Sequence, residues 1–182
     1  MSQVDAWRVP EPDWVLDALR RHEGALLRYA ASLVGQSRAQ DVVQDAFTKL
    51  CAEPLVSVEG HLAAWLFTVC RNRALDLRRA ERRLSTMDEE AEMVESPDSG
   101  PCEKVERAQN LSRVGAAMAT LPSRQQEILR LKLEAGLSYK DIAEVMNLTV
   151  SNVGFILHSA IARVREHLVE PEPVARVEGG AR

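Results

Sequence analysis

Apolar residues recur at helical spacing along most of the chain, and breaks in this pattern separate the predicted helices. The first runs from a cap at Asp13 to Gly35, with Gly24 as a point of interruption. Ser37 and Gln40 then fit a capping box that starts a second helix. The apolar face of this second helix consists of Val42, Val43, Ala46, Phe47 and Leu50. Its outward positions are Asp41, Gln44, Asp45, Thr48 and Lys49.

The next predicted helix changes from apolar to strongly basic along its length. It follows a loop at residues 54–60 and begins near His61. Its apolar stripe consists of Leu62, Trp65, Leu66 and Val69. Residues 71–83 then hold six arginines against two acids, a local charge of +4. Residues 85–107 reverse the sign, with eight acids against two basic residues, and contain two prolines and a glycine. This composition predicts a flexible acidic linker over 85–108.

The second half of the chain is helical again. Ser123 and Gln126, directly after Pro122, fit another capping box and open an amphipathic run that ends at Gly136. A short helix, a turn at residues 146–148 and a last helix from about Thr149 follow. The predicted buried stripe of the last helix is Val150, Val153, Leu157, Ile161, Val164 and Leu168.

Residues 137–153 have the length and capping pattern of a helix-turn-helix, whose second helix enters the major groove of DNA. Ser138 and Asp141 supply the capping box. The predicted helix–helix contacts are Ile142, Ala143, Leu148, Val150 and Val153. The outward positions are Ser151, Asn152, Phe155 and His158, and Lys140 is placed to hold a phosphate. Asn can pair with adenine, and Phe can contact a thymine methyl. The alternative is an ordinary helical hairpin with a solvated outer face.

Composition narrows the class of protein. Aromatic residues make up 4% of the 182 residues, which favours helices packed through Leu, Val, Ile and Ala over a sheet. The net charge of −4 argues against a uniformly basic nucleic-acid binder. Cys51, Cys70 and Cys102 form no disulfide framework, and the first two are expected to be buried. The four histidines have no metal-ligand spacing, so we expect no metal, no cofactor and no enzyme. With no long apolar run, we expect a cytoplasmic protein without membrane insertion.

The predicted fold is all-α, with two small helical domains joined by the acidic linker and a helix-turn-helix in the second. The expected boundaries are a loose leader at 1–12, a first domain at 13–84, the linker at 85–108, a second domain at 109–169 and a disordered tail at 170–182.

Three segments carry a resemblance to one family. Residues 65–79, Trp-Leu-Phe-Thr-Val-Cys-Arg-Asn-Arg-Ala-Leu-Asp-Leu-Arg-Arg, resemble the −10-reading helix of the extracytoplasmic-function (ECF) group of bacterial RNA polymerase sigma factors. Residues 41–50 are similar to its segment that docks on the polymerase clamp helices, and residues 121–165 to its −35-reading domain. The resemblance implies a sigma factor that binds core RNA polymerase, directs it to promoter DNA and promotes melting.

The resemblance also implies site residues. Asn72 and the 54–60 loop would face the single-stranded −10 element, and Arg71, Arg78 and Arg79 would hold phosphates. Trp65 is a candidate for base stacking, although its place on the apolar stripe favours core packing. The −35 candidates are Lys140, Ser151, Asn152, Phe155 and His158. The recognition helix has fewer basic residues than the family usually has, so its base preference does not carry over.

The polymerase-docking face would combine Asp41, Gln44 and Asp45 with Phe47 and Leu50, the last two serving equally well as core. Where the family has Asp-Ala-Glu-Asp, residues 38–41 read Arg-Ala-Gln-Asp. Phosphorylation of Ser37 or Thr48 by a Ser/Thr kinase would restore the missing negative charge; the alternative is that Ser37 is only a cap. An anti-sigma factor is a further candidate partner. The rival function is a two-domain helix-turn-helix regulator that never docks on polymerase.

Overall fold

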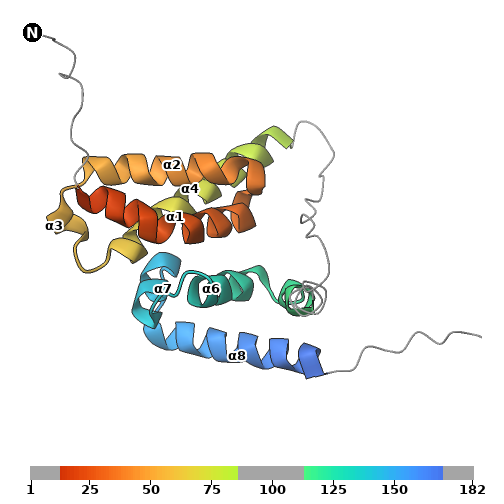
Figure 1. Ribbon diagram of the computed structural model, residues 1–182. Helices are drawn as coiled ribbons and strands as arrows, with labels where there is room; N and C mark the ends of the chain where they lie inside the picture. The colour runs from red at the N-terminus through yellow and green to blue at the C-terminus, as the bar shows by residue number, and fades with distance from the viewer. Residues whose placement is uncertain (1–12, 86–112, 170–182) are drawn as a thin grey trace, which may run out of the picture.

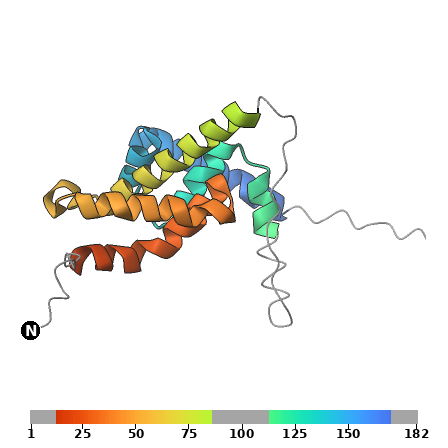
Figure 2. The ribbon, with the colours of Figure 1, turned by 90° about the horizontal axis from the view of Figure 1, so that it is seen from above.

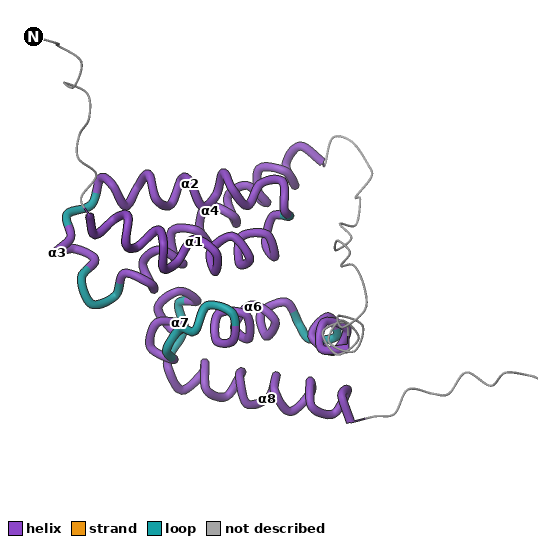
Figure 3. Tube along the Cα trace, viewed as in Figure 1, coloured by secondary structure: helices purple, strands orange, loops and turns teal. Residues whose placement is uncertain are grey.

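The computed structural model describes residues 13–85 and 113–169, and its regular elements are helices throughout these ranges (Figures 1 and 3). The first domain consists of α1 (Asp13–Val34), α2 (Gln36–Ala52), the short α3 (Leu55–Val58) and α4 (Leu62–Ser85). The second consists of helical residues 113–119, α6 (Ser123–Leu133), α7 (Tyr139–Met146) and α8 (Val150–Val169). The all-α, two-domain prediction is confirmed. The predicted leader, the tail and all of the linker except Ser85 lie outside the described residues.

The core of the first domain lies where α1, α2 and α4 meet. Its largest fully buried side chains are Leu26, Tyr29, Val42, Leu50, Leu66 and Phe67. The rings of Tyr29 and Phe67 meet edge to face with centroids 5.4 Å apart, a favoured aromatic geometry. Cys70 is buried as predicted, and burial raises the pKa of its thiol to about 12. Cys51 is exposed, because it lies beside rather than on the apolar face of α2.

The junction between α1 and α2 differs from the prediction in its cap. α1 runs through Gly24 without a break and begins at Asp13 itself. Gly35 adopts φ 80° and reverses the chain within one residue, so α2 begins immediately after it, at Gln36. No side chain caps α2, and Ser37 and Gln40 are the second and fifth residues of the helix. The capping box predicted for these two residues is therefore wrong.

The start of α6 and the 54–60 loop also differ from expectation. Pro122 occupies the N-cap of α6, and the Gln126 amide reaches back to donate to the Leu121 carbonyl at 2.8 Å instead of accepting from a backbone N–H. The capping box predicted at Ser123 is therefore wrong. In the loop, α3 forms one helical turn that buries Val58 and leaves Val56 79% exposed.

The helix-turn-helix prediction agrees with the structure at nearly every position. Ser138 and Asp141 form the reciprocal capping box of α7, and Asn147 ends that helix in the left-handed region at φ 51°. α7 and α8 meet at 100°, within the range of DNA-binding helix-turn-helix motifs. Val150 and Ile161 are 49% and 42% exposed and not buried as predicted. The buried stripe instead passes through Val153, Leu157 and Ala160.

The two domains pack against each other as two layers (Figure 1), and the view from above shows α4 crossing over the second domain (Figure 2). α4 contacts α7, and buried residues of both domains belong to one hydrophobic cluster. No single helix within residues 13–85 and 113–169 is long and apolar enough to cross a membrane.

Candidate functional site

A polar cluster of three side chains joins the two domains. The Glu127 carboxylate, on α6, accepts a hydrogen bond from the Tyr29 hydroxyl of α1 at 2.7 Å. The same oxygen accepts from Arg71 Nε of α4 at 2.8 Å, and the second carboxylate oxygen lies 3.5 Å from Arg71 Nη2. The side chains of Arg71 and Glu127 are only 22% and 13% exposed. We call Tyr29, Arg71 and Glu127 the interdomain cluster.

Electrostatics inside the cluster keep the Tyr29 hydroxyl protonated and the Arg71 guanidinium charged. Burial and the adjacent Glu127 carboxylate raise the pKa of Tyr29 above its usual value, so its hydroxyl remains a donor. Burial disfavours the charge on Arg71, but the bonds to Glu127 outweigh it and raise the Arg71 pKa. At neutral pH Tyr29 therefore donates as a neutral phenol and Arg71 as a cation.

The residues predicted for the −10 element are not equally accessible. Asn72 and Arg78 are exposed on α4, and Arg79 is exposed but pairs with Asp76 one turn away at 2.7 Å. Arg71 is half-buried and held by Glu127, which the prediction did not foresee. Trp65 is partly buried against the core, in keeping with its packing alternative.

The predicted polymerase-docking residues separate into a surface set and a core set. Asp41 and Gln44 are exposed on α2. Asp45 pairs with Arg73 of α4 at 2.6 Å, so its charge is already partly neutralised. Leu50 is fully buried and belongs to the core, which corrects its place on the docking face. Phe47 is 8% exposed and lines a cavity of about 360 Å³ between α1 and α2 that Gln44 also lines.

The departure at residues 38–41 has a structural partner. Arg38 forms an ion pair with Glu81 of α4, which ties the start of α2 to the basic helix. Ser37 is exposed beside it. Thr48 is also exposed, but its hydroxyl donates to the Gln44 carbonyl at 2.8 Å. The structure thus gives the Arg38 charge an acidic partner on α4.

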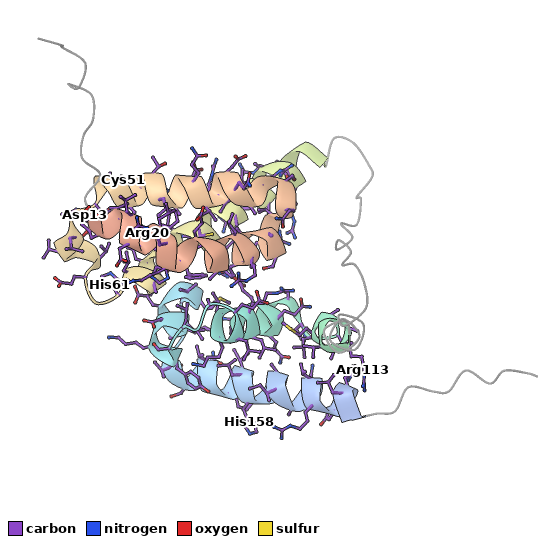
Figure 4. The ribbon with its side chains drawn as sticks, in the orientation of Figure 1. Asp13, Arg20, Cys51, His61, Arg113 and His158 are labelled. Carbon is purple, nitrogen blue, oxygen red and sulfur yellow. The ribbon has the colours of Figure 1, made fainter. Side chains whose placement is uncertain are left out.

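The outward face of α8 holds the residues predicted for the −35 element. The Thr149 hydroxyl accepts from the Asn152 N–H at 3.2 Å and fixes the start of this helix. Ser151, Asn152 and His158 are exposed, and Phe155 is 76% exposed. His158 lies on the side of α8 that faces away from the first domain (Figure 4). Lys140 is exposed near the start of α7. Each of the five side chains predicted for the −35 element is therefore exposed.

Sequence reasoning missed the interdomain cluster and the basic residues of α6. Tyr29 and Glu127 are 98 residues apart, and nothing in the local pattern of either helix marks them as partners.

Within the described ranges, no group of three His, Cys, Asp or Glu side chains could hold a metal ion.

Comparison with known proteins assigns both domains. The family model described as Sigma-70 region 2 matches residues 18–84, and the model described as Sigma-70 region 4 matches residues 111–168. The chain is 29% identical over 175 residues to the ECF RNA polymerase sigma factor SigL of Mycobacterium tuberculosis, covering 93% of this chain and 97% of that one. It is 28% identical over 132 residues to the ECF RNA polymerase sigma factor RpoE of Cereibacter sphaeroides, covering 71% and 70%.

Solved structures show the same fold. The sigma factor RpoE in complex with the anti-sigma factor NepR from Bartonella quintana matches with a TM-score of 0.64 and 24% identity, covering 87% of this chain and 99% of that chain. CnrH in complex with the cytosolic domain of CnrY matches with a TM-score of 0.53 and 23% identity, covering 85% and 86%.

The two family models match successive parts of the chain, in the order that the sequence predicts, and together they span most of both helical domains. The sigma factor relatives align across the same domains. The chain therefore belongs to the ECF group of sigma-70 RNA polymerase sigma factors, which initiate transcription and are not enzymes.

Proposed function

We propose that this sigma factor uses three separate exposed surfaces to bind core polymerase, the −10 element and the −35 element. The polar face of α2, Asp41 and Gln44, docks on the clamp helices of core RNA polymerase. Asn72, Arg78, Arg79 and the α3 segment hold the opened −10 element. The start of α8, with Lys140 of α7, reads the −35 element. One observation supports the division: each of these surfaces is exposed, while the opposite face of its helix forms the core.

The domain boundaries follow from this division. Residues 13–84 are the polymerase-docking and −10 domain, residues 109–169 are the −35 domain, and residues 85–108 connect them. The site of action is the cytoplasm, where bacterial polymerase meets promoter DNA. Arg71 joins the −10 surface only when it leaves Glu127, because its guanidinium is occupied in the interdomain cluster.

An anti-sigma factor is part of the proposal. Two structures with this fold are complexes, one with the anti-sigma factor NepR and one with the cytosolic domain of CnrY. The cavity between α1 and α2, lined by Phe47 and Val43, offers an apolar site on the docking side of the first domain. Control by a Ser/Thr kinase at Ser37 or Thr48 stays a prediction, and the Arg38–Glu81 pair weakens the charge argument for it.

Docking on polymerase is tested by reversing charge on α2. We expect Asp41→Lys combined with Gln44→Lys to weaken affinity for core polymerase at least tenfold, about 1.4 kcal/mol, because it turns an acidic surface basic. Binding is measured by titration with purified core in the absence of DNA. Asp45 is left unchanged, since reversing it would also break its pair with Arg73.

The matched control is Glu166→Lys, an acid that is also exposed, on α8. It should bind core as the wild type does, and circular dichroism should show unchanged helix content for both variants. Wild-type affinity in the α2 double variant would contradict the docking surface and favour a regulator that acts without polymerase contact.

Base reading by α8 is tested separately from phosphate contact. We expect Asn152→Ala to relax preference at one base pair of the −35 element, with a loss of discrimination of about 1–3 kcal/mol. Lys140→Ala should instead weaken binding to every sequence and reduce its salt dependence, because a phosphate contact carries no sequence information. Selection from a randomised promoter library measures both effects. An unchanged preference for Asn152→Ala would remove α8 from the base-reading role.

A further inference from the structure

A cavity of about 360 Å³ lies between the two domains and is lined by arginines from both. Arg71 and Arg78 come from α4, and Arg124 and Arg130 come from α6. Glu127 is the only acid among the residues that line it. Four guanidinium groups around one carboxylate leave the cavity with an excess of positive charge.

Much of that charge has no partner. Glu127 is paired with Arg71, and Arg130 lies 3.4 Å from Glu134, which directly follows α6. Among the residues that the structure describes, Arg78 and Arg124 have no ion-pair partner. They project from different domains towards the same space. Bringing like charges together in this way costs free energy that an anion between them would offset.

The start of α6 adds to the same field. This helix has 11 residues, and no side chain caps its N-terminus. Its first two residues, Ser123 and Arg124, both line the cavity. The free N–H groups and the positive end of the helix dipole therefore lie beside the unpaired arginines, and both favour an anion.

We propose that this interdomain cavity binds a small multivalent phosphate anion. Several guanidinium groups and a helix N-terminus suit the tetrahedral, multiply charged phosphate group, for which arginine forms paired hydrogen bonds. A volume of about 360 Å³ lies in the range of small-ligand sites. Inorganic pyrophosphate and the phosphate chain of a nucleotide share this chemistry.

Binding there would hold the two domains together. The anion contacts Arg78 on one domain and Arg124 on the other, so it stabilises the closed arrangement by binding to it alone. In that arrangement Arg71 stays on Glu127. The ligand would thus keep two proposed promoter contacts occupied, Arg71 on Glu127 and Arg78 on the anion, while the site itself does not depend on the promoter assignments.

The test is a calorimetric titration of the full chain, at low salt and without divalent metal, with pyrophosphate and in a second arm with ATP. We expect saturable binding to wild type and at least tenfold weaker binding to Arg124→Gln. The control is Arg163→Gln, an exposed arginine of α8 away from the cavity, which should bind as wild type does. Equal affinity for both ligands assigns the site to the phosphate chain, and tighter ATP binding adds a nucleoside contact.

A further variant distinguishes anion binding in the interdomain cavity from nonspecific attraction to a basic surface. Glu127→Ala removes a negative charge, so nonspecific attraction predicts tighter anion binding. The cavity predicts weaker binding, because the domains that form it lose their link. Tighter binding by Glu127→Ala, or wild-type binding by Arg124→Gln, would overturn the proposal. Displacement of pyrophosphate by a short single-stranded DNA at lower concentration than by ATP would assign these arginines to DNA instead. No polymerase or promoter is present, so failure here leaves the proposed function untouched.

Discussion

Glu127→Ala is expected to separate the two helical domains while each remains folded. The substitution removes the acceptor shared by Tyr29 and Arg71. Hydrogen bonds to charged groups contribute about 1.5–3 kcal/mol each, and a half-buried cation without its partner is costly. Because the Arg71 side chain keeps 22% exposure, we expect roughly 2–4 kcal/mol against the closed arrangement. Opening returns both donors to water, so the protein relieves the penalty without unfolding.

Small-angle X-ray scattering measures the separation through the radius of gyration, and circular dichroism checks that helix content is unchanged. The matched control is Glu134→Ala, which removes an acid directly after α6 whose bond is to Arg130, four residues earlier. It should leave the radius of gyration unaltered. If Glu127→Ala scatters as wild type does, apolar packing of α4 on α7 alone holds the domains together.

The substitution Glu127→Gln shows how much of the domain separation is due to the lost charge and how much to the lost hydrogen bonds. The amide oxygen can still accept from the Tyr29 hydroxyl, but the carboxylate partner of Arg71 is lost. We expect a radius of gyration between those of the wild type and the alanine variant. A radius of gyration equal to that of Glu127→Ala would assign the whole effect to the ion pair with Arg71.

The helix-turn-helix could be predicted because its determinants are local. Ser138 and Asp141 bond each other across one turn, and Asn147 tolerates the left-handed conformation that ends α7. The outward positions of α8 followed from the same periodicity. Val150 was placed wrongly because the first residue of a helix lies where the chain still turns, and its side chain need not follow the stripe.

Two other capping boxes failed for a physical reason. A serine three residues before a glutamine matches the capping-box motif in the sequence, but backbone geometry decides where the helix begins. Gly35 at φ 80° and Pro122 at φ −54° each occupy the N-cap position ahead of the predicted serine. The pattern therefore located these helices to within two residues but misassigned their caps.

The least predictable features were those that depend on contacts between distant segments. Arg71 was identified as a phosphate contact from its own helix, yet its partner lies on the other domain. Arg38 and Asp45 were read as free surface charges, and both pair with α4. Long polar side chains choose partners by tertiary proximity, which hydrophobic periodicity does not report.

Phe67→Ala is expected to destabilise the first domain by about 3–5 kcal/mol, because it removes a large side chain from a packed core and leaves a cavity. Phe67 is fully buried on α4 and supports the ring of Tyr29 at 5.4 Å. The whole free energy of unfolding of such a domain is of order 5–15 kcal/mol, so the loss is a large share of it.

The chain offers a control with identical chemistry. Phe155→Ala makes the same substitution at a side chain that is 76% exposed, and it should change stability by no more than about 0.5 kcal/mol. Urea unfolding followed by circular dichroism measures both variants. Because Tyr29 rests on Phe67 and also bonds Glu127, the buried substitution should loosen the interdomain cluster as well, whereas the exposed one should not. Equal costs for the two phenylalanines would mean that the core of the first domain is not packed as the structure shows.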